Sequence, residues 1–289
     1  MQLLVNIVVL ASIYSLIACG YVLIYRVSRV LNLAHGELMM LGAYLLLATA
    51  SLFNATPALA IAAAILLSTT AGVLVYVLLM RRMTGETVLA AILTTVALGI
   101  LVRGVVVLIW SPQQQYPAQA LHVTNPTLAF GTAHISTWSV ALVLANAAVY
   151  CGLFVFLRFG RWGMRMRAAG QNPLLAAQRG INLHGVYALA WALSTFTGSA
   201  AGMLMALDSG LTMSLPVIAL KAFPAALVGG LDSLGGALLG ASVVAAAEVM
   251  LIYYVDPLLS DVIPFLVLIA VLIVRPWGLF GTREELDRV

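Results

Sequence analysis

Three charged side chains interrupt long apolar stretches of this sequence. Charged residues in such stretches are the first candidates for a functional site. They are Arg103, Lys221 and Glu248, and each lies five to eight residues from one end of its stretch. If the stretches cross a membrane as helices, all three would sit about 7–11 Å below the same surface, because a helix rises about 1.5 Å per residue. We expect an intramembrane charge cluster in which Glu248 pairs with Lys221 or Arg103. Such a cluster would form a polar vestibule for a zwitterionic or polar solute, or it would only hold helices together.

A second polar segment, Asn32-Leu-Ala-His-Gly-Glu37, follows Arg29 closely, which predicts that it lies at the membrane surface. Asn32 would cap a helix, and Glu37 would suit the positive end of that helix. His35 and Glu37 are two residues apart, so they cannot share a helix face. This spacing argues against a proton relay and against a metal site, and we expect no metal. The segment is either a helix start packed at the surface or part of a translocation pathway formed by Asn32, His35, Gly36 and Glu37.

A glycine-rich break separates two apolar stretches near residue 230. Four glycines surround Asp232 and Ser233 there, and Pro224 precedes them. Glycine permits unusual backbone angles, and proline is expected to shorten the preceding helix. Because irregular backbone is tolerated at membrane depth where protein buries it or water lines it, we interpret 217–236 as a broken pathway helix. Its candidate pathway residues are Lys221, Phe223, Pro224, Gly229, Gly230 and Asp232.

The pattern of a short helix lies inside a basic loop, residues 158–185, which holds five arginines and no acidic residue. Asn172 is suited to cap this helix, Pro173 to be its first residue and Gly180 to follow its end. A membrane protein that keeps one pre-capped helix outside the bilayer is expected to use it for contact with a partner. The candidate contact segment is therefore this helix, Asn172–Gly180.

The elements that must position these residues are membrane-spanning helices. Hydrophobic residues make up 63% of the 289 and charged residues only 8%, whereas soluble domains carry about a quarter charged residues. This composition predicts an all-α polytopic membrane protein, with residues 1–289 as one transmembrane domain. We expect about 8–9 transmembrane helices, one or two of them broken or re-entrant. Apolar stretches of spanning length lie at 3–25, 57–80, 87–110, 136–157, 186–207 and 237–255, and shorter ones at 33–52, 217–231 and 262–274.

The placement of arginine predicts the orientation. Nearly all arginines fall in alternate connections between the stretches, and the positive-inside rule puts these connections in the cytoplasm, the N-terminus outside and the C-terminus inside. The segment 111–136, which holds no Lys or Arg, would then be a periplasmic loop, too short for a solute-binding domain. A full stretch followed by an interrupted one occurs twice in opposite orientation (3–25 with 31–44, and 186–207 with 217–236), which suggests an inverted repeat. The arginines assigned to the cytoplasmic side are Arg26, Arg29, Arg81, Arg82, the five of the basic loop, Arg275, Arg283 and Arg288.

Four sequence motifs are spread over nearly the whole chain. They are Leu31–Tyr44 (LNLAHGELMMLGAY), Met166–Asn172 (MRAAGQN) with Gly180–Asn182 (GIN), Leu220–Phe223 (LKAF) with Gly229-Gly230 and Gly236-Ala237, and Arg275–Gly281 (RPWGLFG). These motifs resemble those of the permease subunits of branched-chain amino acid importers of the ATP-binding cassette (ABC) class. The resemblance is to the LivH type rather than to its longer paralogue, LivM. The first and third motifs are specific, and together they identify the chain as a member of this family, with the ABC importer permease fold.

The resemblance implies a protein of the bacterial inner membrane that imports branched-chain or related hydrophobic amino acids by alternating access. It implies a second, paralogous permease (LivM-type), two cytoplasmic ABC ATPases that use ATP, and a periplasmic solute-binding protein. The chain itself would need no cofactor and would not be an enzyme.

The resemblance also assigns a role to the basic loop. Ala176, Ala177 and Gly180 look like a shortened coupling signature, which would make 158–185 the coupling loop that docks on an ATPase. Relatives with similar motifs import urea, short amides or aromatic acids, and departures from the family's pattern in the pathway segment leave these solutes open. The departures are at Pro224, Asp232 and Gly235.

A function of a different class, as a self-sufficient channel or secondary transporter, would need a coupling site of its own. Such sites usually consist of carboxylates or histidines at the membrane midplane, and the acidic residues of this chain lie too near the surfaces to supply one. The sequence has no G-x-x-x-x-G-K-[S/T] loop for ATP and no nucleophile–base spacing for a membrane enzyme. Its arginines are expected to set topology and to contact lipid rather than nucleic acid.

Overall fold

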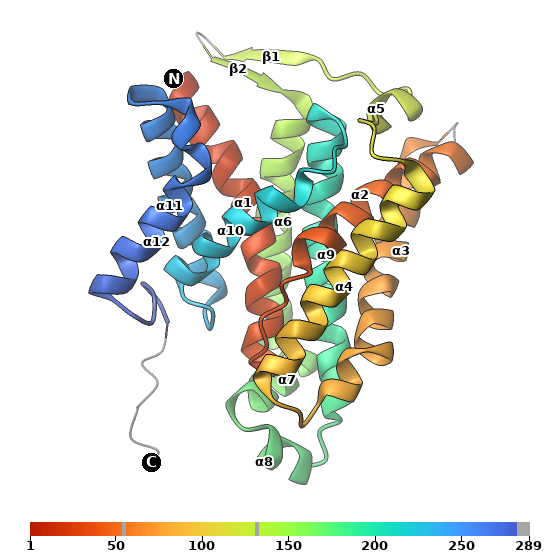
Figure 1. Ribbon diagram of the computed structural model, residues 1–289, viewed down its shortest axis with the longest axis vertical. Helices are drawn as coiled ribbons and strands as arrows, with labels where there is room; N and C mark the ends of the chain where they lie inside the picture. The colour runs from red at the N-terminus through yellow and green to blue at the C-terminus, as the bar shows by residue number, and fades with distance from the viewer. Residues whose placement is uncertain (54–55, 131–132, 282–289) are drawn as a thin grey trace.

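The computed structural model describes residues 1–53, 56–130 and 133–281, and most of them are helical. Long helices run side by side along the longest axis of the molecule (Figure 1). Seven of the described helices are long and apolar enough to cross a membrane, and two shorter apolar helices, α10 (Leu215–Gly229) and α12 (Ile263–Val274), accompany them. The protein is therefore an all-α multi-pass membrane protein, as the sequence predicts. The seven long helices are α1 (Gln2–Ser28), α2 (His35–Leu52), α3 (Pro57–Leu78), α4 (Val88–Trp110), α6 (Thr137–Phe159), α9 (Leu183–Ser209) and α11 (Leu234–Tyr254).

The centre of the bundle is formed by α1 and α9, which contact each other and are mostly buried. Their buried faces carry small residues such as Ser15, Gly20 and Gly198. Small residues let two membrane helices approach closely, and the core also buries large side chains such as Tyr14 of α1 and Trp191 of α9. By contrast, most residues of α3, α4 and α6 face outward, many of them leucine and valine. These outer helices thus offer an apolar surface to the membrane or to another subunit.

The helix α2 begins inside the bundle rather than at its surface. After α1 ends at Ser28, the chain turns back, and α2 starts at His35 beside Gly20 of α1. Because Gly20 lies eight residues before the end of α1, the start of α2 is about 12 Å from that end. The connection can be followed in Figure 1 as it returns along α1. The prediction that Asn32–Glu37 lies at the membrane surface is therefore wrong, because Arg29 marks the end of α1 and not the level of the residues that follow.

The helix α10 also begins inside the bundle, and its start meets the start of α2. After α9 ends at Ser209, a short connection leads back to Leu215, the first residue of α10. Gly36 lies so close to this point that a Cβ added to it would be 3.0 Å from the carbonyl oxygen of Pro216. The helices α1 and α9 run in opposite directions (Figure 1), so the two units have the arrangement that an inverted repeat predicts.

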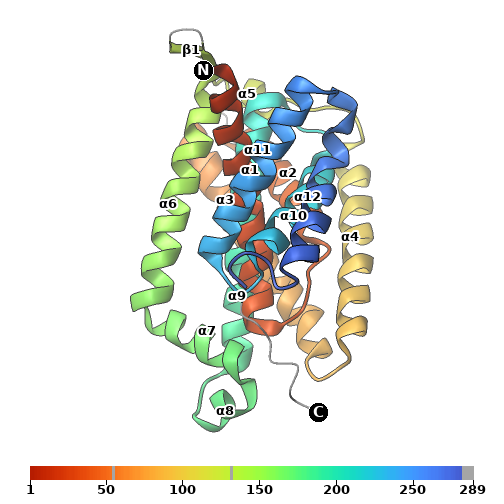
Figure 2. The same ribbon diagram turned by 90° about the vertical axis from the view of Figure 1, so that its left-hand side faces the viewer.

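The two ends of the bundle differ in character. At one end, which we call the basic end, α7 (Arg161–Gln171) turns away from the direction of α6 and α8 (Pro173–Gln178) projects farthest (Figure 2). Arg283 and Arg288, which the sequence assigns to the same side, lie outside the described residues. The opposite end carries α5 (Pro117–Ala120) and an antiparallel hairpin that the all-helical prediction did not include. The hairpin pairs β1 (Thr127–Phe130) with β2 (Ala133–Ser136). Elsewhere in the described chain, the 3-10 helices η1 (Met80–Met83) and η2 (Pro257–Asp261) lie between α3 and α4 and between α11 and α12.

The segment 111–136 is tied across the opposite end by polar contacts. The backbone N–H of Gln115 donates to the carbonyl of Leu211 at 3.0 Å, and the reverse hydrogen bond is 2.8 Å long. The carboxylate of Asp208, in the last turn of α9, accepts hydrogen bonds from Asn125 Nδ2 of the segment at 3.1 Å and from Ser139 Oγ of α6 at 3.3 Å. The segment is therefore fastened to the end of α9 and to the connection that leads into α10.

Candidate functional site

The most buried charges of the described chain lie between α1, α10 and α11. Lys221 Nζ is 2.6 Å from Glu248 Oε1, and Tyr14 donates its O–H to Glu248 Oε2, also at 2.6 Å. Lys221 is in addition 3.4 Å from Asp261 Oδ1 on η2. The side chains of Lys221 and Glu248 are only 12% and 3% exposed, whereas that of Asp261 is 76% exposed. The pairing of Glu248 with Lys221 that the sequence suggests is thus present, and it connects the interior of the bundle to an exposed carboxylate.

Arg103 does not join this cluster. Its Nη2 lies 3.8 Å from Oε1 of Glu37, and its side chain is 48% exposed. The helix α4, which carries Arg103, packs against α2, which carries Glu37. The prediction of a three-residue cluster is therefore wrong for Arg103. The position of a residue along its span indicates its depth in the membrane, but it does not indicate which helices are its neighbours.

His35 is fully buried between α1 and α9. Its ring centre is 4.6 Å from that of Tyr21, and its Nδ1 lies 3.3 Å from Ser194 Oγ. Gly20 faces the ring at a distance that leaves no room for a Cβ. The side chain of Glu37 points the other way, toward α4, so the two side chains diverge as their spacing requires. His35 is thus packed into the bundle at the level where α2 and α10 begin.

Asn32 shapes the connection that leads into α2, although it is not the cap of that helix. The residue before the first helical position is Ala34, and Asn32 Oδ1 accepts a hydrogen bond from the Ala34 N–H at 3.1 Å. The predicted capping by Asn32 is wrong because the helix starts two residues later. The neighbouring Leu33 N–H donates to Thr95 Oγ1 at 3.1 Å, which anchors the connection to α4. Asn32 and Gly36 are both buried here, and their part in a pathway stays a prediction.

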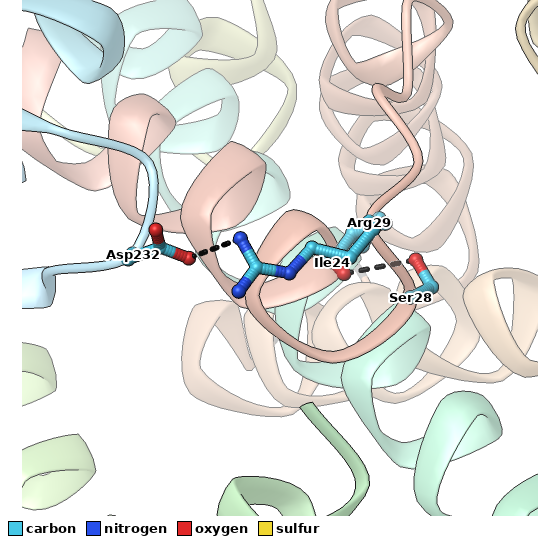
Figure 3. Close-up of polar contacts among 4 residues, drawn as sticks. All are labelled: Ile24, Ser28, Arg29 and Asp232. Atoms are coloured by element: carbon cyan, nitrogen blue, oxygen red, sulfur yellow. Dashed lines mark hydrogen bonds and ion pairs between the residues drawn. The ribbon is translucent and has the colours of Figure 1, made fainter. Parts of the chain in front are cut away.

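The glycine-rich turn between α10 and α11 is tied to the end of α1. Arg29 Nη1 donates to Asp232 Oδ1 at 2.7 Å (Figure 3). The backbone of Arg29 is left-handed, with φ at 55°, and the turn is opened by Gly230, whose φ of 99° suits glycine best. The side chain of Arg29 is 42% exposed and that of Asp232 is 20% exposed. This ion pair therefore joins two connections that lie far apart in the sequence, and it does so at a partly exposed position.

The remaining candidate residues of the segment 217–236 lie in α10 or next to it. The sequence predicts that Pro224 shortens its helix, but α10 continues through this residue to Gly229. Neighbouring helices can satisfy the carbonyl that a proline frees, so proline is tolerated inside membrane helices. Phe223 packs edge-on against Tyr21, with the ring centres 5.3 Å apart, and Gly229 lies too close to Gly236 for any side chain. These contacts hold α10 against α1 and α11.

The short helix α8 has the capping that the sequence predicts. Asn172 Oδ1 accepts a hydrogen bond from the Leu175 N–H at 3.0 Å, and Pro173 is the first helical residue. Gly180 follows the last cap with φ at 78°, a value at which a side chain would be strained. Because these contacts are all within nine residues, the two ends of α8 are specified locally.

Two leucines of α8 are exposed at the basic end. Leu174 is 69% exposed and Leu175 is 56% exposed, whereas Ala176 is buried against the bundle. A cavity of about 440 Å³ lies between α8 and the connection from α3 to α4, and Leu174 and Ala177 line it. Exposed apolar side chains next to a hollow are a common feature of surfaces that bind another protein.

The sequence contains further signals at two of these places. Tyr14 is a polar residue in the middle of an apolar stretch, which could have marked it as a partner for Glu248. Leu174 and Leu175 are adjacent apolar residues in a basic loop, which could have marked an exposed contact. No sequence signal identifies Arg29 as the partner of Asp232, because the two residues are 203 positions apart.

Comparisons with known proteins give a consistent result. Residues 3–272 match the protein family described as branched-chain amino acid transport system / permease component. The whole chain is 29% identical to the high-affinity branched-chain amino acid transport system permease protein LivH of Salmonella typhimurium and covers 97% of that protein. It is 28% identical to the corresponding BraD protein of Pseudomonas aeruginosa, with 100% of this chain and 98% of that protein covered. Against a probable LivH protein of Methanocaldococcus jannaschii the identity is 26%, over 95% of this chain and 90% of that protein.

A solved structure has a similar fold. It is PsaBC from Streptococcus pneumoniae in complex with Fab, and the TM-score is 0.50 over 97% of this chain and 94% of the solved chain. Because the sequence identity is only 14%, this likeness concerns the fold alone.

Proposed function

We propose that this chain, which belongs to the family of permease components of branched-chain amino acid transport systems, is the membrane-spanning subunit of an ABC importer for branched-chain or related hydrophobic amino acids. The family match over residues 3–272 and the full-length similarity to LivH and BraD proteins support this function. The structural observation that carries it is α8, a capped helix beyond the spans with two exposed leucines. The sequence has no nucleotide-binding loop, so ATP would act through a partner.

In this proposal the basic end faces the cytoplasm, so the N-terminus lies outside the bacterial inner membrane and the C-terminus inside. The distribution of arginine supports this orientation. The helix α8 docks on one of two ABC ATPases, which bind and hydrolyse ATP, and the chain itself takes no cofactor. A second, paralogous permease completes the pathway. A periplasmic solute-binding protein delivers the amino acid at the opposite end, where the segment 111–136 lies.

The packing of α8 suggests how movement of an ATPase would reach the pathway. The helix α8 contacts α7 and α9, and α7 contacts α1, α6 and α9. Since α9 packs against α2 and α1 packs against α10, a displacement of α8 would act on the level where α2 and α10 begin. Small shifts at one site become larger rearrangements when packed helices have two alternative arrangements. Alternating access would follow from such a rearrangement.

The coupling role of α8 can be tested with Ala177→Trp in the assembled transporter. Ala177 is exposed and lines the cavity beside α8, so a bulky side chain there should block the approach of an ATPase. We expect the leucine-stimulated ATPase activity of the reconstituted complex with its binding protein to be abolished. Gln178→Trp is the matched control, because Gln178 is also exposed on α8 but is not among the residues that line this cavity.

Normal stimulation in the Ala177→Trp complex would contradict the docking of α8. The same assay separates the remaining alternatives. Stimulation by urea, a short amide or an aromatic acid, and not by leucine, would reassign the solute and leave the importer class intact. Uptake of leucine into proteoliposomes without ATP would replace the importer by a channel or a secondary transporter.

A further inference from the structure

A second cavity of about 720 Å³ opens at the basic end, away from α8. Its walls come from α1, α6 and α7 and from the start of α11. One part of its lining is basic and consists of Arg26, Arg158 and Arg167. The other part is aromatic and aliphatic, and it includes Phe154 and Leu238. The cavity therefore combines a cationic region with an apolar one.

The basic part of this cavity has an excess of positive charge. Among the residues that the structure describes, Asp232 is the only acidic one that lines it, and its carboxylate is already paired with Arg29 at 2.7 Å. Arg26 is close enough to interact electrostatically with both Arg167 and Asp232. Like charges held near one another are stabilised when an anion lies between them. The three guanidinium groups thus favour an anionic ligand.

These guanidinium groups keep hydrogen-bond donors for such a ligand. Arg167 donates from Nη1 to the carbonyl of Leu157, and Arg158 lies over the ring of Phe154 at 5.6 Å. A guanidinium has five N–H donors in a planar fork, so one backbone hydrogen bond or one ring contact leaves several of them available. This fork matches the oxygen atoms of a phosphate group.

The position of the cavity indicates where the anion comes from. It lies beside α7, which buries Gly163, Met166 and Ala169 and exposes Arg165 and Trp162. A helix with arginine and tryptophan on its outer side, set across the ends of apolar helices, is typical of the membrane interface (Figure 2). The apolar wall of the cavity belongs largely to α6, most of whose residues face outward. A ligand there would have its anionic part at the interface and its apolar part along α6.

We propose that this cavity binds an anionic phospholipid, whose phosphate contacts Arg26, Arg158 and Arg167 and whose acyl chains lie along Phe154 and Leu238. The proposal rests on the placement of this chain in a membrane and not on its role in transport. Basic pockets between helices at a membrane surface are known to hold anionic headgroups. The bound lipid would join α6 and α7 to the turn that follows α10.

The test measures lipid binding to the purified full chain in detergent by native mass spectrometry. Phosphatidylglycerol should bind more tightly than phosphatidylethanolamine. Arg158→Gln should weaken the binding of phosphatidylglycerol about fivefold, since one basic residue near a membrane surface contributes roughly that factor. Arg165→Gln is the matched control, because Arg165 is exposed in the same loop and stacks on Trp162 at 4.9 Å outside the cavity.

Arg158 is the better target than Arg167, because Arg158 is exposed and Arg167 also supports the backbone of α6 at Leu157. Equal weakening by Arg158→Gln and Arg165→Gln would overturn the proposal, since it would mean general attraction to the basic end. Displacement of phosphatidylglycerol by inorganic phosphate at low concentration would also overturn it, since the site would then hold free phosphate. So would equal binding of the two lipids.

Discussion

The region of α10 is held by two ion pairs that have similar lengths and different surroundings. Lys221 and Glu248 are 2.6 Å apart, both nearly buried, and Tyr14 supplies a further hydrogen bond to the carboxylate. Arg29 and Asp232 are 2.7 Å apart, and both remain partly exposed. The distances alone would suggest equal strength. The two pairs nevertheless differ in strength, because a buried charge that loses its partner costs much more free energy than an exposed one.

This difference indicates which part of the α10 region can separate. The contact of α10 with α11 at Lys221 and Glu248 is expected to persist through any movement, since breaking it would leave a carboxylate unpaired in the bundle. The weaker pair joins the turn after α10 to the end of α1, and breaking this pair by itself costs little free energy. In the proposed transporter, movement of the α10 region would therefore occur at Arg29 and Asp232.

The largest effect is expected for Lys221→Met. This change keeps much of the length of the side chain but leaves Glu248 buried without its cation. Breaking a buried pair in this way should lower the free energy of unfolding by roughly 3–5 kcal/mol. The loss would be measured as a fall in the unfolding temperature of the purified chain in detergent, with Leu220→Met as the control for a methionine at an exposed neighbouring position.

A double substitution separates the charge from the packing. Glu248→Gln added to Lys221→Met removes the unpaired carboxylate, so it should restore part of the lost stability. If Lys221→Met alone is as stable as the unchanged protein, the buried pair contributes nothing and the contrast between the two pairs disappears.

A smaller loss is expected for Tyr14→Phe. The substitution removes one hydrogen bond to the Glu248 carboxylate, which still keeps Lys221 as its partner. Hydrogen bonds to charged groups contribute about 1.5–3 kcal/mol, so the unfolding temperature should fall less than with Lys221→Met. Tyr116→Phe, at a half-exposed tyrosine near the opposite end, serves as the control. A loss equal to that of Lys221→Met would mean that Tyr14, and not the lysine, stabilises the carboxylate.

The same contrast shows what the sequence could predict. Hydropathy and local capping follow from nearby residues, so the apolar spans and the capped helix at Asn172–Gly180 were predicted with useful accuracy. These features depend on hydropathy and on hydrogen bonds within a few residues. Their physical causes are short-range, and a single sequence contains them.

The errors concern features that depend on contacts between distant segments. Arg103 lies on a helix that packs against α2, and no local pattern indicates that neighbour. The return of the chain after Arg29 depends on Gly20, which makes room for His35 fifteen residues later. Pro224 does not end α10, because the surrounding helices tolerate it there. In each case the result is decided by tertiary packing.

The smallest effect on stability is expected for Arg29→Gln, and this prediction tests the weaker pair. Because Arg29 is 42% exposed, its pair with Asp232 should contribute no more than about 1 kcal/mol, and the unfolding temperature should change little. A double-mutant cycle with Asp232→Asn isolates the contribution, which should fall further at about 1 M salt because screening is then nearly complete. A coupling energy as large as that of the buried pair would mean that the turn after α10 cannot part cheaply from α1. Any movement of α10 would then have to begin at another contact.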